Sequence, residues 1–264
     1  MSDVAAATAT SLTAVLAGPG AGAPRLRATR LVTTPLVLLT VLLALYFWVN
    51  GQRLDSIEQR TLNREYLVTA VIAHFKIALL ASAIILIIAV PLGIVLSRRR
   101  ARLAAPLFLM LANVGQAFPA IGLLVLLTLV FGIGLKVALI SFVAYGVLPV
   151  LRNTIVGLQQ IDPGLIEAAR GIGMKPRQIL TRVELPLAVP VLLAGVRTTL
   201  VLTVGVATLA TFVNAGGLGD IIVNGLKLNR ITVEVTGALL TMCVAFFVDW
   251  LARIGEDLFR PHGL

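Results

Sequence analysis

The sequence predicts an all-α integral membrane protein with about six transmembrane helices. Of its 264 residues, 58% are hydrophobic and only 13% are charged, whereas soluble domains lie near one half apolar and one quarter charged. The mean hydropathy is +0.99. Apolar runs long enough to cross a hydrocarbon core of roughly 30 Å recur along the chain, separated by short charged segments. These observations exclude an ordinary soluble domain.

Residues 1–30 precede the first apolar run and are rich in Ala, Thr, Gly and Pro. The sequence AGA at 21–23 resembles the cleavage site of a secretory signal, which is the alternative interpretation. However, the first charge is Asp3, and no basic region precedes the weakly apolar stretch. We therefore expect residues 1–30 to form a flexible tail.

Six apolar segments have the length and composition of spanning helices. They cover residues 31–49, 71–96, 104–131, 135–157, 187–213 and 231–252. The second carries His74 and Lys76 at its outer end, so its membrane part is expected to begin near Ile77. The third contains QAFPA, where Pro119 lacks a backbone donor and should kink the helix. The first span and the external connection after it would occupy residues 31–66.

Lysine and arginine are unevenly divided between the connecting segments. If the N-terminus is cytoplasmic, the cytoplasmic side holds more than twice as many of them as the external side. The run SRRRAR at 97–102 is the strongest anchor. The positive-inside rule therefore predicts a multi-pass chain with both termini in the cytoplasm, including a C-terminal tail at 256–264.

Several other classes of function are disfavoured. The net charge of +10 does not indicate nucleic-acid binding, because the basic residues lie in short loops between apolar runs. Cys243 is the only cysteine, and His74 and His262 are the only histidines, so neither a metal site nor a catalytic cluster is expected. An ion-coupled secondary transporter is the less favoured transport alternative, since no acidic residue lies deep within a span and no clear repeat occurs.

One charged segment, residues 162–186, interrupts the apolar sequence. Its seven charged side chains between 162 and 184 would cost on the order of 20 kcal/mol to immerse in lipid, so the segment must lie outside the hydrocarbon. Asp162 is a favourable N-cap with Pro163 in the first helical position. Gly171 and Gly173 should end this first helix, one of them in a left-handed conformation.

A second short helix is expected to follow in the same segment. Pro176 can begin it, and the sequence RQILTRVEL can continue it. It should end near Pro186, where the next span starts. The result would be a compact pair of helices outside the membrane, and a simple connecting loop is the alternative.

The spacing of this segment resembles the EAA loop of permease subunits of bacterial ABC importers, E-A-A-x3-G-x9-I-x-L-P. The matching residues are Glu167, Ala168, Ala169, Gly173, Leu185 and Pro186, with Val183 in place of Ile. The resemblance implies that the first short helix is a coupling helix seated in a cleft of a cytoplasmic ATPase. It also implies which residues serve the coupling: Glu167, Ala168, Ala169, Gly171 and Gly173, with Leu185 and Pro186 at the return to the membrane.

The chain lacks a nucleotide-binding motif of its own. None of its four lysines follows a glycine, so the Walker A sequence G-x-x-x-x-G-K-[ST] cannot be written. We therefore expect a transport subunit rather than an enzyme, with no cofactor in this chain. ATP and magnesium would be bound by a separate ATPase subunit.

Three stretches narrow the resemblance to permeases for glycine betaine, choline, carnitine and related osmoprotectants. They are NVGQAFPAIGLL (113–124), DPGLIEAARGIGM (162–174) and the segment 195–222, which ends in ATLATFVNAGGLGDII. Permeases for methionine, phosphonate and taurine share a glycine-rich ending and remain alternatives. The resemblance implies a type I ABC importer transmembrane domain over residues 67–255 in the bacterial inner membrane. It further implies ATPase subunits, an external substrate-binding protein and a second permease subunit as partners, besides membrane lipid.

Polar residues in or near the spans are candidates for the translocation path, because unsatisfied polar groups are costly there. The candidates are Asn113, Gln116, Thr203, Thr208, Thr211 and Asn214, together with Pro119 at the kink. Hydrogen bonding between helices is the alternative role for each of them.

A second glycine cluster, NAGGLGD at 214–220, is expected on the outer side. It could form a re-entrant turn or an outer gate containing Gly216, Gly217 and Gly219, and a simple loop is equally compatible. Arg197 is expected to extend to the cytoplasmic face, with pairing across a subunit interface or a place in the path as alternatives. Asp249 and Arg253 should pair along one helix.

Overall fold

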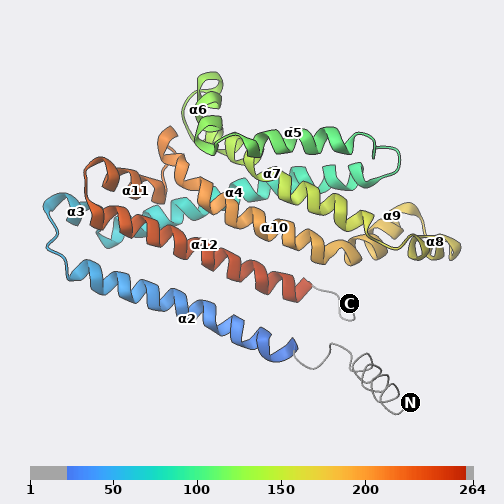
Figure 1. The fold of residues 1–264 in the computed structure, drawn as a ribbon, viewed down its shortest axis with the longest axis horizontal. Helices are drawn as coiled ribbons and strands as arrows, with labels where there is room; N and C mark the ends of the chain where they lie inside the picture. Colours follow the sequence, from blue (N-terminus) through green and yellow to red (C-terminus); the bar gives the residue numbers. More distant parts are fainter. Residues whose placement is uncertain (1–22, 260–264) are drawn as a thin grey trace, which may run out of the picture.

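The computed structural model describes residues 23–259, with the side chains of residues 31–259. Over this part of the chain every regular element is a helix. Five long helices form the body of the molecule: α2 (Ala23–Asn50), α4 (Arg64–Ser97), α7 (Leu135–Gln159), α10 (Leu185–Ala207) and α12 (Ile231–Phe259). Figure 1 shows them running alongside one another, with α2 at the edge of the bundle.

Shorter helices lie at the two ends of this bundle. One end carries α3 (Ser56–Thr61), the 3-10 segment η2 (Thr208–Val213) and α11 (Leu218–Lys227). The other end carries α8 (Pro163–Gly171), α9 (Pro176–Ile179) and the π-helical segment η1 (Leu180–Glu184). In Figure 1, α2 begins and α12 ends towards the end that carries α8 and α9, where α4 is also joined to α5.

The third predicted span is broken. It consists of α5 (Ala105–Ala117) and α6 (Ala120–Phe131), which meet at an angle of 100°. The proline at position 119 lacks a backbone donor and adopts an extended conformation between the helices, with φ −55° and ψ 127°. The predicted break at Pro119 is confirmed, and it is a sharp bend rather than a mild kink. Counting this pair as one span, the described helices could cross a membrane up to six times, as predicted.

The core of the bundle lies between α4, α7 and α10, where small residues allow the backbones to approach closely. A methyl group added to Gly93 would come within 2.6 Å of the Thr154 Cβ, and one added to Gly195 within 2.8 Å of the Asn153 Cβ. Close contacts through glycine are typical of helices that associate in lipid. The hydrophobic effect does not drive helices together there, so close van der Waals packing does. The three helices therefore form one tightly packed unit.

Two helix starts differ from the prediction. The helix α2 begins at Ala23, inside the predicted flexible tail, because Pro24 suits the first helical turn and the Leu, Arg and Ala residues that follow are good helix formers. The helix α4 begins at Arg64 rather than near 71, because the Asn63 side chain accepts a hydrogen bond from the Tyr66 N–H at 2.8 Å. Residues 1–22 of the predicted tail lie outside the described part.

The predicted helix end near Pro186 is wrong, because the chain continues without interruption from α9 through η1 into α10. Pro186 cannot donate to the preceding turn, but the π-helical turn just before it widens the helix and shifts the donors by one residue. Leu185 accordingly donates to the Leu180 carbonyl oxygen, five residues back. At the C-terminus, α12 extends to Phe259, so the first residues of the predicted tail 256–264 are helical.

Candidate functional site

The helix α8 forms as predicted and stands at one end of the bundle. The Asp162 Oδ1 accepts a hydrogen bond from the Gly164 N–H at 2.8 Å, which caps the helix, and Pro163 occupies its first turn. At the far end Gly173 has a φ of +85°, so it is this glycine that takes the left-handed conformation. The Met174 N–H then donates to the Ala169 carbonyl oxygen at 3.1 Å and completes the turn.

The two faces of α8 differ. Ala169 is buried, and Ile166 packs against the cluster formed by Leu158, Ile161, Ala188 and Leu192 at the ends of α7 and α10. The rest of the surface of α8 is exposed and contains Leu165, Glu167, Ala168, Arg170 and Gly171, and Ile172 and Gly173 directly after the helix are exposed as well. Leu165 and Ile172 add two exposed apolar side chains, 49% and 80% exposed, to this surface. Of the EAA residues, Glu167 and Ala168 therefore lie on a free face, whereas Ala169 holds the helix to the bundle.

The return of this segment to the bundle contains an ion pair that sequence reasoning missed. Glu184, 6% exposed at the end of η1, accepts two hydrogen bonds from the guanidinium group of Arg98, at 2.9 and 2.6 Å. Arg98 is the C-cap of α4 and the first arginine of the run at 98–100. The sequence did contain one indication of this pair. Glu184 directly precedes an apolar span, where an unpaired buried charge is costly, so it should have a basic partner. Leu185 and Pro186, next to it, are half-buried, and Leu185 packs against the apolar cluster below α8.

Six of the seven candidate residues for the translocation path fall into two groups. Asn113, Gln116 and Pro119 lie on α5 and at the bend, where the Asn113 side chain donates to its own helix at Leu109 O, 2.8 Å away. Thr208, Thr211 and Asn214 lie on and after η2, which α6 contacts. The helix α6, which follows the bend, and η2 are thus neighbouring elements.

Thr203 differs from the other path candidates because it is enclosed by protein. Its side chain is only 1% exposed, and its hydroxyl lies 2.6 Å from that of Ser82 on α4. It also donates to the Leu200 carbonyl oxygen at 2.9 Å. In this structure Thr203 therefore joins α10 to α4 by a hydrogen bond and does not face an open passage.

The glycine cluster after η2 makes a tight turn that packs against α4. Asn214, Gly216 and Gly217 all have positive φ angles, of 55°, 84° and 100°. Gly217 lies directly on His74, so a methyl group there would come within 3.2 Å of the His74 Nδ1. The His74 Nε2 lies 3.1 Å from the Val204 carbonyl oxygen, and because a carbonyl can only accept, Nε2 carries the proton. The turn leads into the amphipathic helix α11 rather than into a simple loop.

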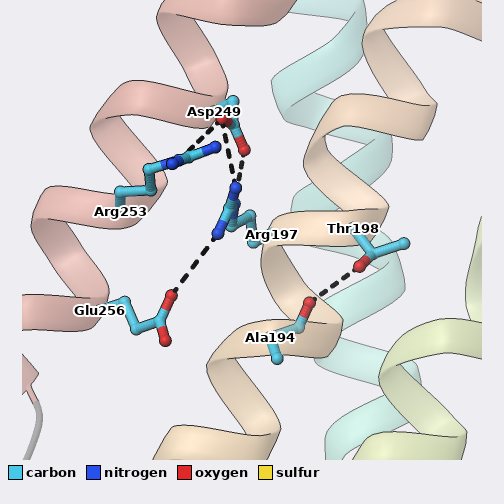
Figure 2. Close-up of polar contacts among 6 residues, drawn as sticks. All are labelled: Ala194, Arg197, Thr198, Asp249, Arg253 and Glu256. Atoms are coloured by element: carbon cyan, nitrogen blue, oxygen red, sulfur yellow. Dashed lines mark hydrogen bonds and ion pairs between the residues drawn. The ribbon is translucent and has the colours of Figure 1, made fainter. Parts of the chain in front are cut away.

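Arg197 belongs to a charge cluster between α10 and α12, which Figure 2 shows. We define the α10–α12 charge cluster as Arg197, Asp249, Arg253 and Glu256. Arg197 donates from Nε to the Asp249 Oδ1 at 2.5 Å and from a terminal nitrogen to Oδ2 at 3.3 Å. Arg253 donates to Asp249 at 2.9 Å, and Glu256 lies 4.0 Å from Arg197. Arg197 thus has a carboxylate partner on the facing helix α12, which the sequence did not indicate. The predicted Asp249–Arg253 pair is confirmed.

Replacing Asp249 by asparagine should destabilise the contact between α10 and α12. Two arginines would lose their shared carboxylate, and hydrogen bonds to charged groups contribute about 1.5–3 kcal/mol each. We expect the midpoint of thermal unfolding in detergent to fall by several degrees. Thr198→Ala is the matched control, because the Thr198 hydroxyl donates to the Ala194 carbonyl oxygen of its own helix and not to α12 (Figure 2). Equal midpoints for the two variants would contradict a stabilising role for the cluster.

Comparisons with known proteins agree with this architecture. The family model described as "Binding-protein-dependent transport system inner membrane component" matches residues 89–260. The choline transport system permease protein OpuBB of Bacillus subtilis is 37% identical over 72% of this chain and 87% of its own length. The carnitine transport permease protein OpuCD of Listeria monocytogenes is 37% identical over 75% of this chain and 89% of its own length. The osmoprotectant import permease protein OsmW of Salmonella typhimurium is 36% identical over 80% of this chain and 100% of its own length.

Among solved structures, the chain resembles a chain of the inward-facing MetNI methionine ABC transporter. The TM-score is 0.62 and the sequence identity is 26%, over 74% of this chain and 96% of that chain. The structural match thus leaves about a quarter of the present chain without a counterpart.

Proposed function

The chain belongs to the family of binding-protein-dependent transport system inner membrane components, and on that premise we propose that it carries a quaternary-amine osmoprotectant, such as glycine betaine, choline or carnitine, into the bacterial cell. It is a permease subunit of an ABC importer. The proposed substrate class rests on the relatives, which are named for choline, carnitine and osmoprotectant transport at 36–37% identity over most of their length. Methionine is the second candidate, because of the likeness to the MetNI transporter.

The observation that carries the proposed mechanism is the exposed face of α8. It combines the carboxylate of Glu167, the small side chain of Ala168 and the apolar side chains of Leu165 and Ile172 on a helix that stands at the end of the bundle. Such a face suits the cleft of a partner protein, because Ala permits a close approach and the apolar side chains gain by burial. The partner that we propose is an ATPase subunit, which would supply the ATP and magnesium sites.

The orientation that we propose puts α8 in the cytoplasm. The arginine run 98–102 and the α8–α9 segment lie at one end of the bundle, the end towards which α2 begins and α12 ends. Excess positive charge is retained on the cytoplasmic side of membranes. Both termini would then be cytoplasmic, and the glycine turn before α11 would face an external substrate-binding protein as an outer gate formed by Gly216, Gly217 and Gly219.

The transport cycle that we propose uses two permease subunits, either two copies of this chain or this chain and a relative. ATP binding would draw the two docked ATPases together, and with them the two α8 helices. The bundle ends in the cytoplasm would close while the outer ends open to the loaded binding protein, and hydrolysis would reset the complex. The polar residues near η2 and at the α5–α6 bend would line the path of the substrate.

Uptake by the reconstituted complex tests this proposal. The chain is purified with its ATPase and its binding protein in vesicles, and uptake of radiolabelled glycine betaine, choline, carnitine and methionine is measured. We expect uptake of at least one quaternary amine that requires ATP and persists when an ionophore abolishes ion gradients. The isolated chain should hydrolyse no ATP, since it contains no Walker A sequence.

Three results would count against the proposal, each in a different way. Uptake of methionine alone would overturn the substrate class while leaving the importer intact. Uptake that survives ATP depletion but is lost with an ionophore would indicate an ion-coupled transporter. Hydrolysis of ATP by the isolated chain would overturn the division of labour between permease and ATPase.

A further inference from the structure

The ion pair between Arg98 and Glu184 joins two segments that are far apart in the sequence. Arg98 ends α4, and Glu184 ends the π-helical segment η1 just before α10 begins. Both terminal nitrogens of the guanidinium group donate, each to one oxygen of the same carboxylate, at 2.9 and 2.6 Å. This bidentate geometry fixes the relative orientation of the two groups as well as their distance. The carboxylate side chain is only 8% exposed, so water competes little for it.

The pair lies at a weak point of the helix. The segment η1 is π-helical, and π turns are places where helices kink and are often found at functional sites. Without further support, a force applied to α8 and α9 would be absorbed by bending at this turn. The apolar cluster beneath α8 supports one side of η1 through Leu180 and Leu185. The ion pair with Arg98 holds η1 to the end of α4. Among the ion pairs of the described residues, no other one joins η1 to a neighbouring helix.

We propose that Arg98 and Glu184 are positioning residues for energy coupling, because they tie η1 to α4 so that a displacement of α8 moves α4 and α10 together. This inference rests on the proposed function of α8 as the contact with the ATPase. Neither residue needs to touch the ATPase or the substrate. Within the arginine run at 98–100, Arg98 thus binds Glu184, whereas the side chains of Arg99 and Arg100 are exposed.

The first experiment measures how much substrate is transported for each ATP hydrolysed by the reconstituted complex. Glu184→Gln and Arg98→Gln should each lower this ratio by about tenfold, while ATP hydrolysis persists. The reciprocal variant Arg98→Glu with Glu184→Arg should restore the ratio to within about threefold of the parent. Arg100→Gln is the matched control and should change nothing, because its side chain is exposed at the same connection.

The second experiment detects the rigid connection itself and needs no knowledge of the substrate. Spin labels are attached at Val95→Cys on α4 and at Lys175→Cys between α8 and α9, both exposed positions away from the docking face, in a background with Cys243→Ser. In the parent complex we expect the distance distribution between the labels to stay the same when ATP and vanadate trap the ATPases closed. With Glu184→Gln, a second distance should appear on trapping, because α8 would move without α4.

The outcomes separate this inference from the proposed function. If the parent complex transports no quaternary amine, the substrate proposal fails, and the label distances still decide the role of the pair. If Glu184→Gln leaves both the transport ratio and the trapped distance distribution like those of the parent, the pair has no part in coupling. A reciprocal variant as defective as the single variants would likewise overturn the inference.

Discussion

Exchanging Glu167 for lysine is expected to reduce ATP-driven uptake by about 100-fold while the chain still inserts into the membrane. Glu167 is exposed on the free face of α8 and makes no hydrogen bond within the described part of the chain that would be needed for folding. At an interface, a reversed charge places like charges together or leaves a buried charge unpaired, which costs several kcal/mol. A cost of about 2.7 kcal/mol corresponds to the expected factor of 100.

Three measurements check this expectation: uptake into vesicles, co-purification of the ATPase, and elution of the detergent-solubilised chain as a single peak. The control is Thr181→Lys, which adds an exposed positive charge in the same charged segment but outside α8. Uptake should be close to that of the parent in the control. If Glu167→Lys kept full uptake, α8 would not be the docking helix.

Replacing Gly219 by alanine is expected to destabilise the packing of α11 against η2. A methyl group at this position would overlap the carbonyl oxygen of Thr208, and its neighbours are backbone atoms that cannot rotate away. Overpacking of this kind costs up to about 3 kcal/mol, which would lower the midpoint of thermal unfolding by roughly 10 °C. The contact joins η2 to α11, so the glycine turn between them would be displaced as well.

Gly205→Ala is the matched control for this substitution. Gly205 lies in α10 with open space around it, and alanine favours a helix more than glycine does. We expect its midpoint to equal or exceed that of the parent. A Gly219→Ala variant with the stability and uptake of the parent would show that η2 and α11 are not packed as described.

The long apolar helices and the start of α8 could be predicted from local sequence, because each depends on a signal within one element. The spans α7 and α12 need only hydrophobic length, and α8 needs only its Asp162 cap, its first-turn proline and a glycine that tolerates a left-handed conformation. The break at Pro119 also followed from one residue. Its angle of 100° did not, because the angle depends on how α6 packs against α7 and η2.

The sequence analysis missed features that depend on contacts between two helices, or that a glycine or proline in the sequence concealed. Pro186 led us to predict a helix end, because proline lacks a backbone donor. The π-helical turn that lets the helix continue through it cannot be inferred from the proline itself. The partner of Arg197 is 52 residues away on α12, so sequence spacing gave no sign of the pair. The helix α11 was concealed by the preceding glycines, although the apolar positions 218, 221, 222 and 226 repeat with helical spacing.

The uninterrupted helix that runs from α9 to η2 has a mechanical consequence. It extends from Pro176 to Val213, 38 residues, or roughly 55 Å at the rise of an α-helix. One of its ends adjoins α8 and the other adjoins the glycine turn before α11. Because the Arg98–Glu184 ion pair holds this helix at η1, close to its α8 end, we expect a displacement of α8 to be carried along the helix towards the glycine turn at its other end.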